Sequence, residues 1–384
     1  MVRKVRTANG GTVREPVGQY WREPGRRASP WLALLVCVAA AAPFGAARAA
    51  MNFCAAPALQ SSERTNAAPA IETLMRQVAG KLGDAPNPLA GLSTEKSRYQ
   101  GADDKRVEGN QDLDLMRDAA LVWRATGDQR YLRLVDRFLF AWATTYQPTY
   151  NPIDETHLDS LIIAYDLTAS ALPVKTRNAT TAFIATLANG YVERIDAEPR
   201  PLKGTFRDKG QSHRVKLIAM SAFTLDDRKL INTAQRLFVE QIGNNVLPDG
   251  ATVDFAERGV LHDVTEDLEP LVVAALAARR HNRNWLNERG KDGASLALAL
   301  DWLQPYALGE KTQKEFVQAS EPVPRDVTRR ETSAPDVSSQ WDPQDSAELF
   351  HLAARLSGRY APTALRVSPT PPDWLAVCLP LPAR

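Results

Sequence analysis

The sequence has few cysteines, few histidines and almost no strand signals. Its 384 residues include three Cys and five His. So few cysteines exclude a disulfide-dense scaffold. The near absence of alternating apolar and polar positions excludes a β-sandwich or a barrel. Hydrophobic residues make up 44% of the chain and charged residues 24%. These are ordinary values for a folded protein, so wholesale disorder is excluded as well.

An excess of charge of one sign is also missing. The chain has 47 Lys+Arg and 45 Asp+Glu, a formal net charge of +2. The first 50 residues hold eight of the basic and two of the acidic residues, which leaves 39 basic and 43 acidic residues in 51–384, a net charge of −4. A mildly acidic body argues against a nucleic-acid partner.

Residues 1–50 are expected to be a secretory signal peptide. Basic residues precede an apolar run at 31–38 and the alanines after it, and small residues near Ala49 and Ala50 offer a cleavage point. The run is short for a membrane span, although an uncleaved anchor is an alternative, as is a weak twin-arginine signal at Arg26-Arg27. We therefore expect a periplasmic or secreted protein with no stable membrane span after cleavage.

Cleavage would remove Cys37 and leave Cys54 and Cys378, one near each end of the mature chain. An even pair of cysteines in an oxidising compartment suggests a disulfide, and two unrelated buried thiols are the alternative. Neither cysteine lies beside a His at metal-ligand spacing, so we do not expect a zinc site.

The spacing of apolar residues in the body is helical. Ile71, Leu74, Met75, Val78 and Leu82 follow steps of three and four residues, which place them on one helix face. The same periodicity, interrupted by Gly, Pro and Asp, predicts further helices at about 111–126, 128–146, 158–169, 176–196, 212–224, 227–245, 263–281, 293–303, 310–319 and 343–357. Short joints between such helices favour stacked antiparallel hairpins, and hence an all-α fold.

Three parts are expected along the chain. A signal peptide spans 1–50, a helical domain spans 51–361, and a Pro-rich tail spans 362–384. The prolines predict an extended strap for the tail. Residues 320–342 are polar and long for a connector, which predicts a surface loop or a lid.

Two polar segments between the helices are candidates for a functional site. Residues 207–214 lead into a helix, and a helix start lined with His, Arg and Gln is suited to bind an anion, although a solvated start capped by Ser212 is the alternative. Residues 247–263 form a connection rich in acidic and basic residues. Within it, Asp254 and Glu257 would be the carboxylate pair of a glycosidase, or else ordinary caps and surface charges.

These segments, with two others, resemble the motifs of bacterial periplasmic alginate lyases. Ser97-Arg98-Tyr99-Gln100-Gly101 is similar to a Ser-Lys-Tyr-x-Gly loop, and Tyr150-Asn151-Pro152 with Thr156 to a second segment. Gln211-Ser212-His213-Arg214 is similar to an Asn-Asn-x-x-Ser-His-Arg motif, and the stretch from Asp249-Gly250 to Leu271 to an Asp-Gly…Glu-Arg…Leu-His-Tyr motif. The resemblance covers roughly residues 95–305.

The resemblance implies an incomplete (α/α) toroid of stacked antiparallel helix hairpins with a central cleft. It also implies β-elimination on a uronate polysaccharide, without a metal or organic cofactor. The proton at C5 of a uronate becomes acidic when donors neutralise the adjacent carboxylate. A base then removes this proton, and an acid protonates the departing glycosidic oxygen. The partner implied is an anionic polysaccharide, and we expect a monomer.

Carried over by position, the resemblance assigns roles to eight residues. The catalytic ones are His213, Arg258 and His262. The substrate-binding ones are Arg98, Tyr99, Asn151, Gln211 and Arg214. Each of them also has an ordinary structural interpretation as a cap or a surface charge.

The chain departs from the family pattern at two places. Asp208-Lys209 replaces the Asn-Asn pair, and Asp263 replaces the Tyr that follows His262. The first change removes neutral donors to a carboxylate, and the second removes the expected proton donor. A non-catalytic glycan-binding or exopolysaccharide-export protein on the same scaffold is therefore the alternative to a lyase.

Overall fold

The computed structural model describes residues 51–54, 61–91, 103–315 and 340–380, which belong to one compact unit, Gly45–Arg384. Its α-helices are α1 (Ser61–Ala79), α3 (Asp103–Thr126), α4 (Gln129–Thr145), α5 (Leu158–Thr168), α6 (Val174–Ala197), α7 (Lys209–Leu225), α8 (Arg228–Asn245), α9 (Val253–Arg258), α10 (Leu261–Arg279), α11 (Leu296–Ala307), α13 (Ala347–Leu356), α14 (Ala361–Val367) and α15 (Asp373–Cys378). The described residues form no β-strand, only two isolated bridges.

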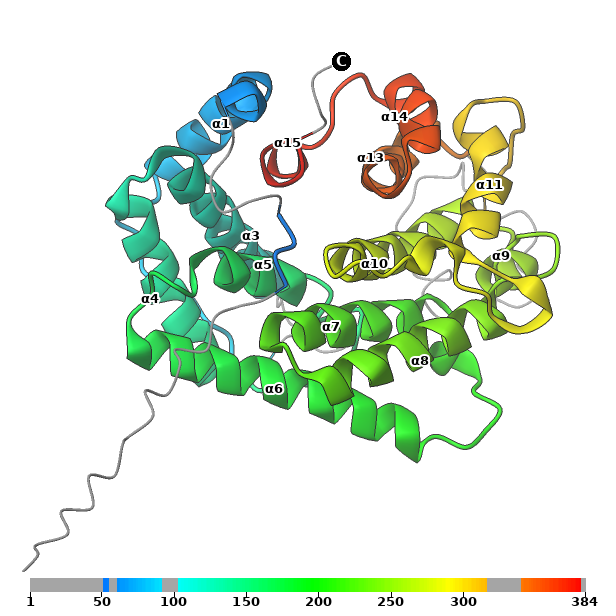
Figure 1. The fold of residues 1–384 in the computed structure, drawn as a ribbon, viewed down its shortest axis with the longest axis horizontal. Coiled ribbons are helices and arrows are strands. Elements are labelled where there is room, and N and C mark those ends of the chain that lie inside the picture. The colour runs from blue at the N-terminus through cyan, green and yellow to red at the C-terminus, as the bar shows by residue number, and fades with distance from the viewer. Residues whose placement is uncertain (1–50, 55–60, 92–102, 316–339, 381–384) are drawn as a thin grey trace, which may run out of the picture. The chain divides into compact units, whose positions relative to one another are not determined.

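Within this unit the helices follow one another around an incomplete ring, as Figure 1 shows. α3 packs on α4 and α5, α4 on α6, α6 on α7, and α7 on α8 and α10, after which α10 packs on α13. Successive helices bury one face against each neighbour, which is how amphipathic helices satisfy their apolar sides. The predicted all-α incomplete toroid is confirmed. No helix in the described ranges is long and apolar enough to cross a bilayer.

α7 is the central helix of the fold. Asp208 caps its start by accepting a hydrogen bond from the Gly210 amide at 2.8 Å, and Asp226 ends it in the left-handed region. Every residue from Gly210 to Thr224 is buried, because α5, α6, α8 and α10 surround the helix. The polar side chains of α7 must therefore find partners inside the protein or face an internal cavity.

One buried carboxylate joins α7 to two neighbouring helices. Asp267 of α10 accepts a hydrogen bond from Ser212 of α7 at 2.5 Å and another from Asn245 of α8. Gln241 of α8 donates to Ser212 at 3.0 Å. Burial raises the pKa of Asp267, although the hydrogen bonds from Ser212 and Asn245 oppose that shift. The network fixes the register of the three helices around the site.

A disulfide ties the first described segment to the last described helix. Cys54 and Cys378 form a disulfide across a sequence separation of 324 residues. The sequence suggested either this bond or two unrelated buried thiols, and the structure has the bond. The amides of Asn52 and Phe53 also donate to Asp166 of α5, at 3.1 and 2.9 Å. Burial raises the pKa of Asp166 to about 6, and the amide bonds oppose that shift.

Two expectations about local structure are wrong. The segment predicted as a helix at 310–319 is not helical over 310–315, and its remainder lies outside the described residues. Gly309, at φ 75°, turns the chain after α11, and Lys314 forms a bridge with Gln340. The tail was expected to be extended, but it forms α14 and α15. Pro362 lies in the first turn of α14 and Pro372 directly before α15, where the missing N–H costs nothing.

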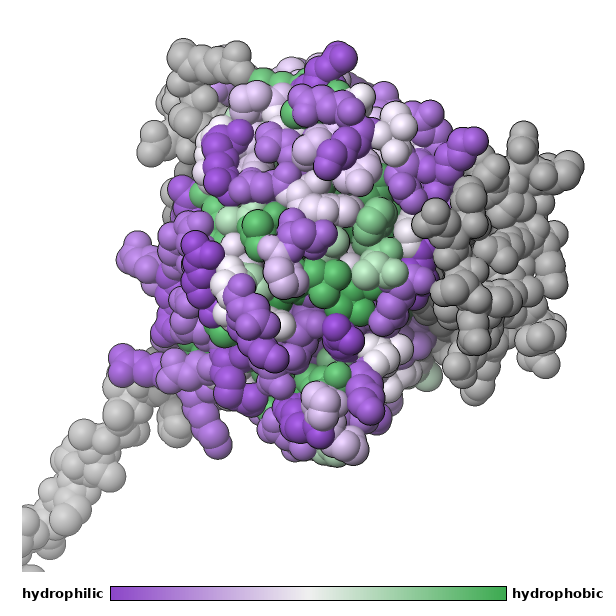
Figure 2. Space-filling view, turned by 90° about the vertical axis from the view of Figure 1, so that its right-hand side faces the viewer, coloured by the Kyte–Doolittle hydropathy of each residue, from purple (hydrophilic) through white to green (hydrophobic). Residues whose placement is uncertain are grey.

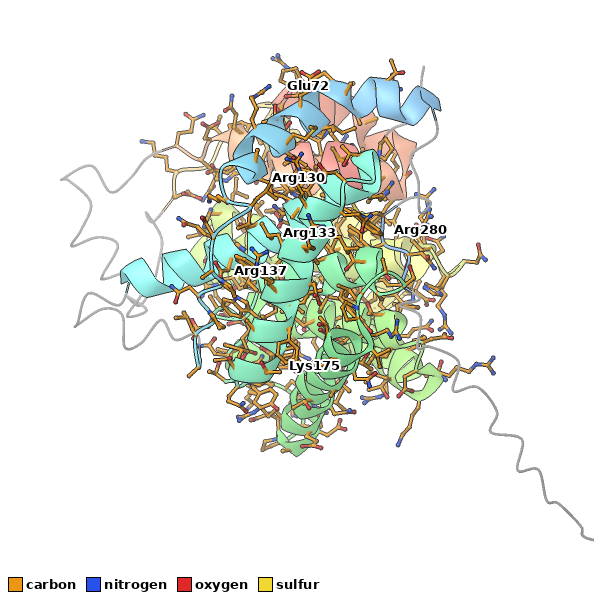
Figure 3. All side chains as sticks on the ribbon, turned by 90° about the vertical axis from the view of Figure 1, so that its left-hand side faces the viewer. Glu72, Arg130, Arg133, Arg137, Lys175 and Arg280 are labelled. Carbon is orange, nitrogen blue, oxygen red and sulfur yellow. A yellow bond between two sulfur atoms is a disulfide. The ribbon has the colours of Figure 1, made fainter. Side chains whose placement is uncertain are left out.

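The outer surface is predominantly polar. Figure 3 looks at the molecule from the left-hand side of Figure 1 and labels Arg130, Arg133 and Arg137 along α4. Arg137 donates to the carbonyls of Leu82 and Asp84, both at 3.0 Å. Figure 2 shows the right-hand side, where hydrophilic side chains surround a band of apolar ones. On α9 and α11, Phe255, Trp302 and Tyr306 are partly buried and pack on one another.

Removal of the disulfide tests how far it stabilises the fold. We expect Cys54→Ala/Cys378→Ala to lower the free energy of unfolding by up to about 5 kcal/mol, because the bond closes a loop across a sequence separation of 324 residues. Thermal unfolding followed by circular dichroism measures the loss. Reductant should lower the melting temperature of the wild type and leave that of the double variant unchanged. Equal melting temperatures of the oxidised wild type and the variant would contradict this role.

Candidate active site

A cavity of about 460 Å³ opens between α3, α5, α7, α10, α13 and α15. Phe53 and Trp374, from opposite ends of the chain, are part of its wall. Its titratable side chains comprise three histidines, two cations and six carboxylates. These are His157, His213, His262, Arg117, Lys216, Asp114, Asp159, Glu266, Glu269, Asp345 and Glu348.

His213 lies in the cavity wall on α7 and is nearly buried, with 9% of its surface exposed. Its Nδ1 atom lies 2.8 Å from Thr156 Oγ1, in the loop before α5. Burial, reinforced by the positive charge of Lys216, lowers its pKa well below that of an ordinary histidine. The ring is therefore neutral at neutral pH, and the hydrogen bond to Thr156 fixes its orientation.

Lys216 lies one turn further along α7 and is held from three directions. Its ammonium donates to Thr156 O and Oγ1, both at 3.0 Å, and to Asp159 at 2.6 Å. Because Thr156 accepts from Lys216 and also contacts His213, the three side chains form one unit. The Lys216 charge lies beside the imidazole that it helps to keep neutral.

Arg117 of α3 brings a second positive charge to the cavity. It pairs with Asp114 at 3.1 Å and Asp118 at 2.9 Å, and its Nη1 donates to Ser160 at 3.2 Å. Its guanidinium also lies 5.0 Å from the centre of the Trp374 ring. Among the described residues the Nη2 group has no hydrogen-bond partner, so it remains available to an anion in the cavity.

α10 presents a stripe of polar side chains to the cavity. His262, Glu266 and Glu269 follow helical spacing, and all three line it. His262 Nε2 lies 3.2 Å from Glu266. Burial opposes ionisation of Glu266, but the hydrogen bond from His262 and the charge of Lys209 outweigh it and lower the pKa. Glu266 is thus a stable anion that orients His262.

The two departures from the family pattern contact each other. Lys209, which stands in place of an Asn, forms an ion pair with Asp263, which stands in place of the Tyr. Lys209 also pairs with Glu266, and Arg258 pairs with Asp263 at 2.8 Å and with Asp254. The side chains of Lys209 and Asp263 are only 12% and 11% exposed. Each compensates the charge of the other, and neither lines the cavity.

The structure brings some of the predicted site residues together and separates others. His213 and His262 line one cavity. Arg258 lies outside it, held by Asp254 and Asp263. Arg98 and Tyr99 lie outside the described residues.

Three predicted substrate-binding residues have internal partners. Arg214 donates to the Thr205 carbonyl and lies 3.9 Å from the centre of the Phe206 ring. Gln211 is 1% exposed. Asn151 accepts a hydrogen bond from the Ile153 amide at 3.2 Å. None of the three lines the cavity.

The glycosidase pair considered from the sequence is not present as a pair. Asp254 is 1% exposed and bonded to Arg258 and to the Lys209 amide at 2.8 Å, whereas Glu257 is exposed on α9. Neither residue lines the cavity. Burial, together with the charge of Asp267, raises the pKa of Asp254.

Several cavity residues were missed from the sequence. Lys216 interrupts the apolar run of α7, and a single charge in a run that is otherwise fully buried is a signal for a site. Glu266 and Glu269 share one helix face with the predicted His262, and a search for polar periodicity would have found them. Arg117 and Glu348 come from helices that are far apart in the sequence, and no local sequence pattern marks either of them as a site residue.

Comparison with known proteins identifies the family. The family model described as alginate lyase matches residues 52–313, well over half of the chain. The chain belongs to the alginate lyase family. It is thereby a polysaccharide lyase, as the motifs in its sequence implied. No curated protein sequence matches it.

Solved alginate lyases share the fold. One from Bacteroides ovatus is 16% identical, with a TM-score of 0.59, and the match covers 81% of this chain and 93% of that one. Alginate lyase A1-III from Sphingomonas species A1 is 13% identical, with a TM-score of 0.58 and coverage of 87% and 97%. At these identities the likeness establishes the fold alone. A variant of A1-III has been solved in complex with a tetrasaccharide, at 13% identity, a TM-score of 0.53 and coverage of 78% and 89%.

A double-mutant cycle tests the compensation between Lys209 and Asp263. Asp263→Tyr alone leaves Lys209 and Arg258 each without one carboxylate, so we expect a loss of about 3 kcal/mol in unfolding free energy. Lys209→Asn removes the other partner. The variant with both changes, which restores the residue types of the family, should lose at least about 1 kcal/mol less than the sum of the single losses. Additive losses in urea denaturation would show that the pair contributes no coupling.

Proposed function

We propose that this lyase cleaves an alginate-like uronate polysaccharide by β-elimination in the cavity around His213. The single observation that carries the proposal is the unit of His213, Thr156 and Lys216, in which a neutral imidazole is oriented beside a fixed positive charge. A base that is uncharged at neutral pH and a cation next to it are what the removal of a proton beside a carboxylate requires.

The proposed reaction begins with neutralisation of the substrate carboxylate. Arg117 and Lys216 both line the cavity, and we assign the uronate carboxylate to these two cations. With a proton on His213 Nδ1 and Thr156 as its acceptor, Nε2 has the free lone pair that removes the C5 proton. The resulting enolate-like charge develops between the same two cations.

Other predicted site residues take supporting roles in this proposal. His262, oriented by Glu266, lies in the same cavity and is assigned to the sugar next to the cleaved bond. Arg258 acts through Asp263 and Lys209 on the position of Glu266. Gln211 and Arg214 stabilise the start of α7 and so the position of His213. Arg98, Tyr99 and Asn151 remain predicted substrate contacts.

We also propose that the mature protein is a periplasmic or secreted monomer. The basic and apolar pattern of residues 1–50 supports export, and the bond between Cys54 and Cys378 fits an oxidising compartment.

The proposed reaction is tested by the absorbance of its unsaturated product. The mature chain, residues 51–384, is incubated with alginate and other polyuronates while ultraviolet absorbance is recorded. We expect a rise on at least one of them, which also identifies the uronate preferred. His213→Ala should reduce the rate at least about 100-fold while it preserves the circular dichroism spectrum, since it removes the base. Full activity of the variant would rule out this assignment.

Binding without cleavage is the alternative, favoured by the excess of carboxylates over cations in the cavity. A flat absorbance trace on every polyuronate, with binding still detected by calorimetry, would support that alternative and reject the lyase reaction.

A further inference from the structure

Glu269 differs from the other cavity carboxylates that are not exposed to solvent, whereas Asp345 is exposed. Asp159 pairs with Lys216, Asp114 with Arg117, and Glu266 with Lys209. Glu348 accepts a hydrogen bond from the Trp374 indole at 3.1 Å. Within the described part of the chain, by contrast, no side chain or amide donates to the Glu269 carboxyl. An interior carboxyl without a donor is costly unless it has a function or carries a proton.

The surroundings of Glu269 favour its protonated form. Burial contributes most, Glu348 of α13 adds a like charge, and Asp159 of α5 and Glu266 of α10 add smaller ones, while Lys216 of α7 opposes them. Together these groups raise the pKa of Glu269 to about 8. The pKa of Glu348 is raised as well, by burial first, although Arg117 of α3 opposes the shift. Burial and the like charges therefore favour the protonated form of Glu269 at neutral pH, and the pKa of Glu348 is shifted in the same direction.

The proposed elimination needs a proton donor, and this chain has no such residue at the position where the family motif has a Tyr. The Tyr of the family motif is Asp263 here, and Asp263 lies outside the cavity in ion pairs with Lys209 and Arg258. No tyrosine is among the described residues that line the cavity. His213 is neutral and Lys216 is fully bonded, so neither offers the proton that the departing oxygen needs.

We propose that Glu269 is the proton donor to the departing glycosidic oxygen, with Glu348 as its partner in sharing the proton. The assignment rests on the proposed function. It is supported by the position of Glu269 in the same cavity as His213, on the α10 face that also presents His262 and Glu266.

The step balances without a further reactant. His213 Nε2 takes the C5 proton, and the electron pair of that C–H bond forms the C4–C5 double bond. The C4–O bond breaks, and its oxygen receives the proton of Glu269. Afterwards His213 carries one proton more and the glutamate pair one fewer, and transfer through solvent restores both.

The test compares Glu269→Gln with a matched control, Glu72→Gln, on two substrates. Glu72 is exposed on α1 and does not line the cavity (Figure 3). One substrate is the polyuronate that the wild type cleaves best. The other is an oligouronate with fluorine at C4 of its non-reducing end, which loses fluoride and needs no acid. Circular dichroism and melting temperature report the fold of each variant.

We expect Glu269→Gln to lower kcat on the polysaccharide at least about 100-fold and on the fluorinated substrate less than about fivefold. The wild-type rate on the polysaccharide should fall as the pH rises through about 8, because the acid must be protonated to act, and this decline should be absent on the fluorinated substrate. Glu72→Gln should match the wild type throughout.

Three outcomes would overturn the assignment. Equal loss on both substrates would make Glu269 a binding or structural residue, and wild-type activity of Glu269→Gln on the polysaccharide would exclude it as the acid. Loss of the alkaline decline in Tyr99→Phe, with Glu269→Gln unaffected, would assign the acid to Tyr99. A wild type that yields no unsaturated product from any polyuronate would instead reject the proposed function, and this assignment with it.

Discussion

The complete burial of α7 is the constraint on which the site depends. A helix surrounded by four others has no water for its polar side chains, so each must be bonded inside or face the cavity. Ser212 is bonded to Asp267 and Gln241, whereas His213 and Lys216 meet at Thr156. The same burial that makes this helix rigid also keeps His213 neutral. The burial of α7 thus accounts both for the rigidity of the helix and for the neutral state of His213.

Charge compensation explains how the chain tolerates its departures from the family pattern. Lys209 and Asp263 would each be unfavourable alone, because a nearly buried charge without a partner costs several kcal/mol. Lys209 and Asp263, together with Arg258 and Glu266, form a network of ion pairs in which positive and negative side chains alternate beside the cavity. Among the described residues, Arg117 and Lys216 are the two cations that line the cavity, and the proposed mechanism assigns the substrate carboxylate to them.

Much of the fold could be predicted from the sequence, and less of the site. Helical periodicity indicated the all-α class, because each helix buries one face against its neighbours. His213 and His262 could be found because they lie in local motifs. Arg117 and Glu348 could not, since only the packing of α3 and α13 against the centre brings them to the cavity. The helical tail was missed because prolines at helix starts resemble those of an extended segment.

The bond between Cys54 and Cys378 has a consequence for the order of biosynthesis. Phe53 and Trp374 each lie within four residues of one of these cysteines, and both form part of the cavity wall. The segment that holds Phe53 must therefore wait for α15 before the wall is complete. A ribosome-bound chain that still lacks α15 has no finished cavity, whatever helices it has already formed. The cavity is thus completed only after α15 has been synthesised.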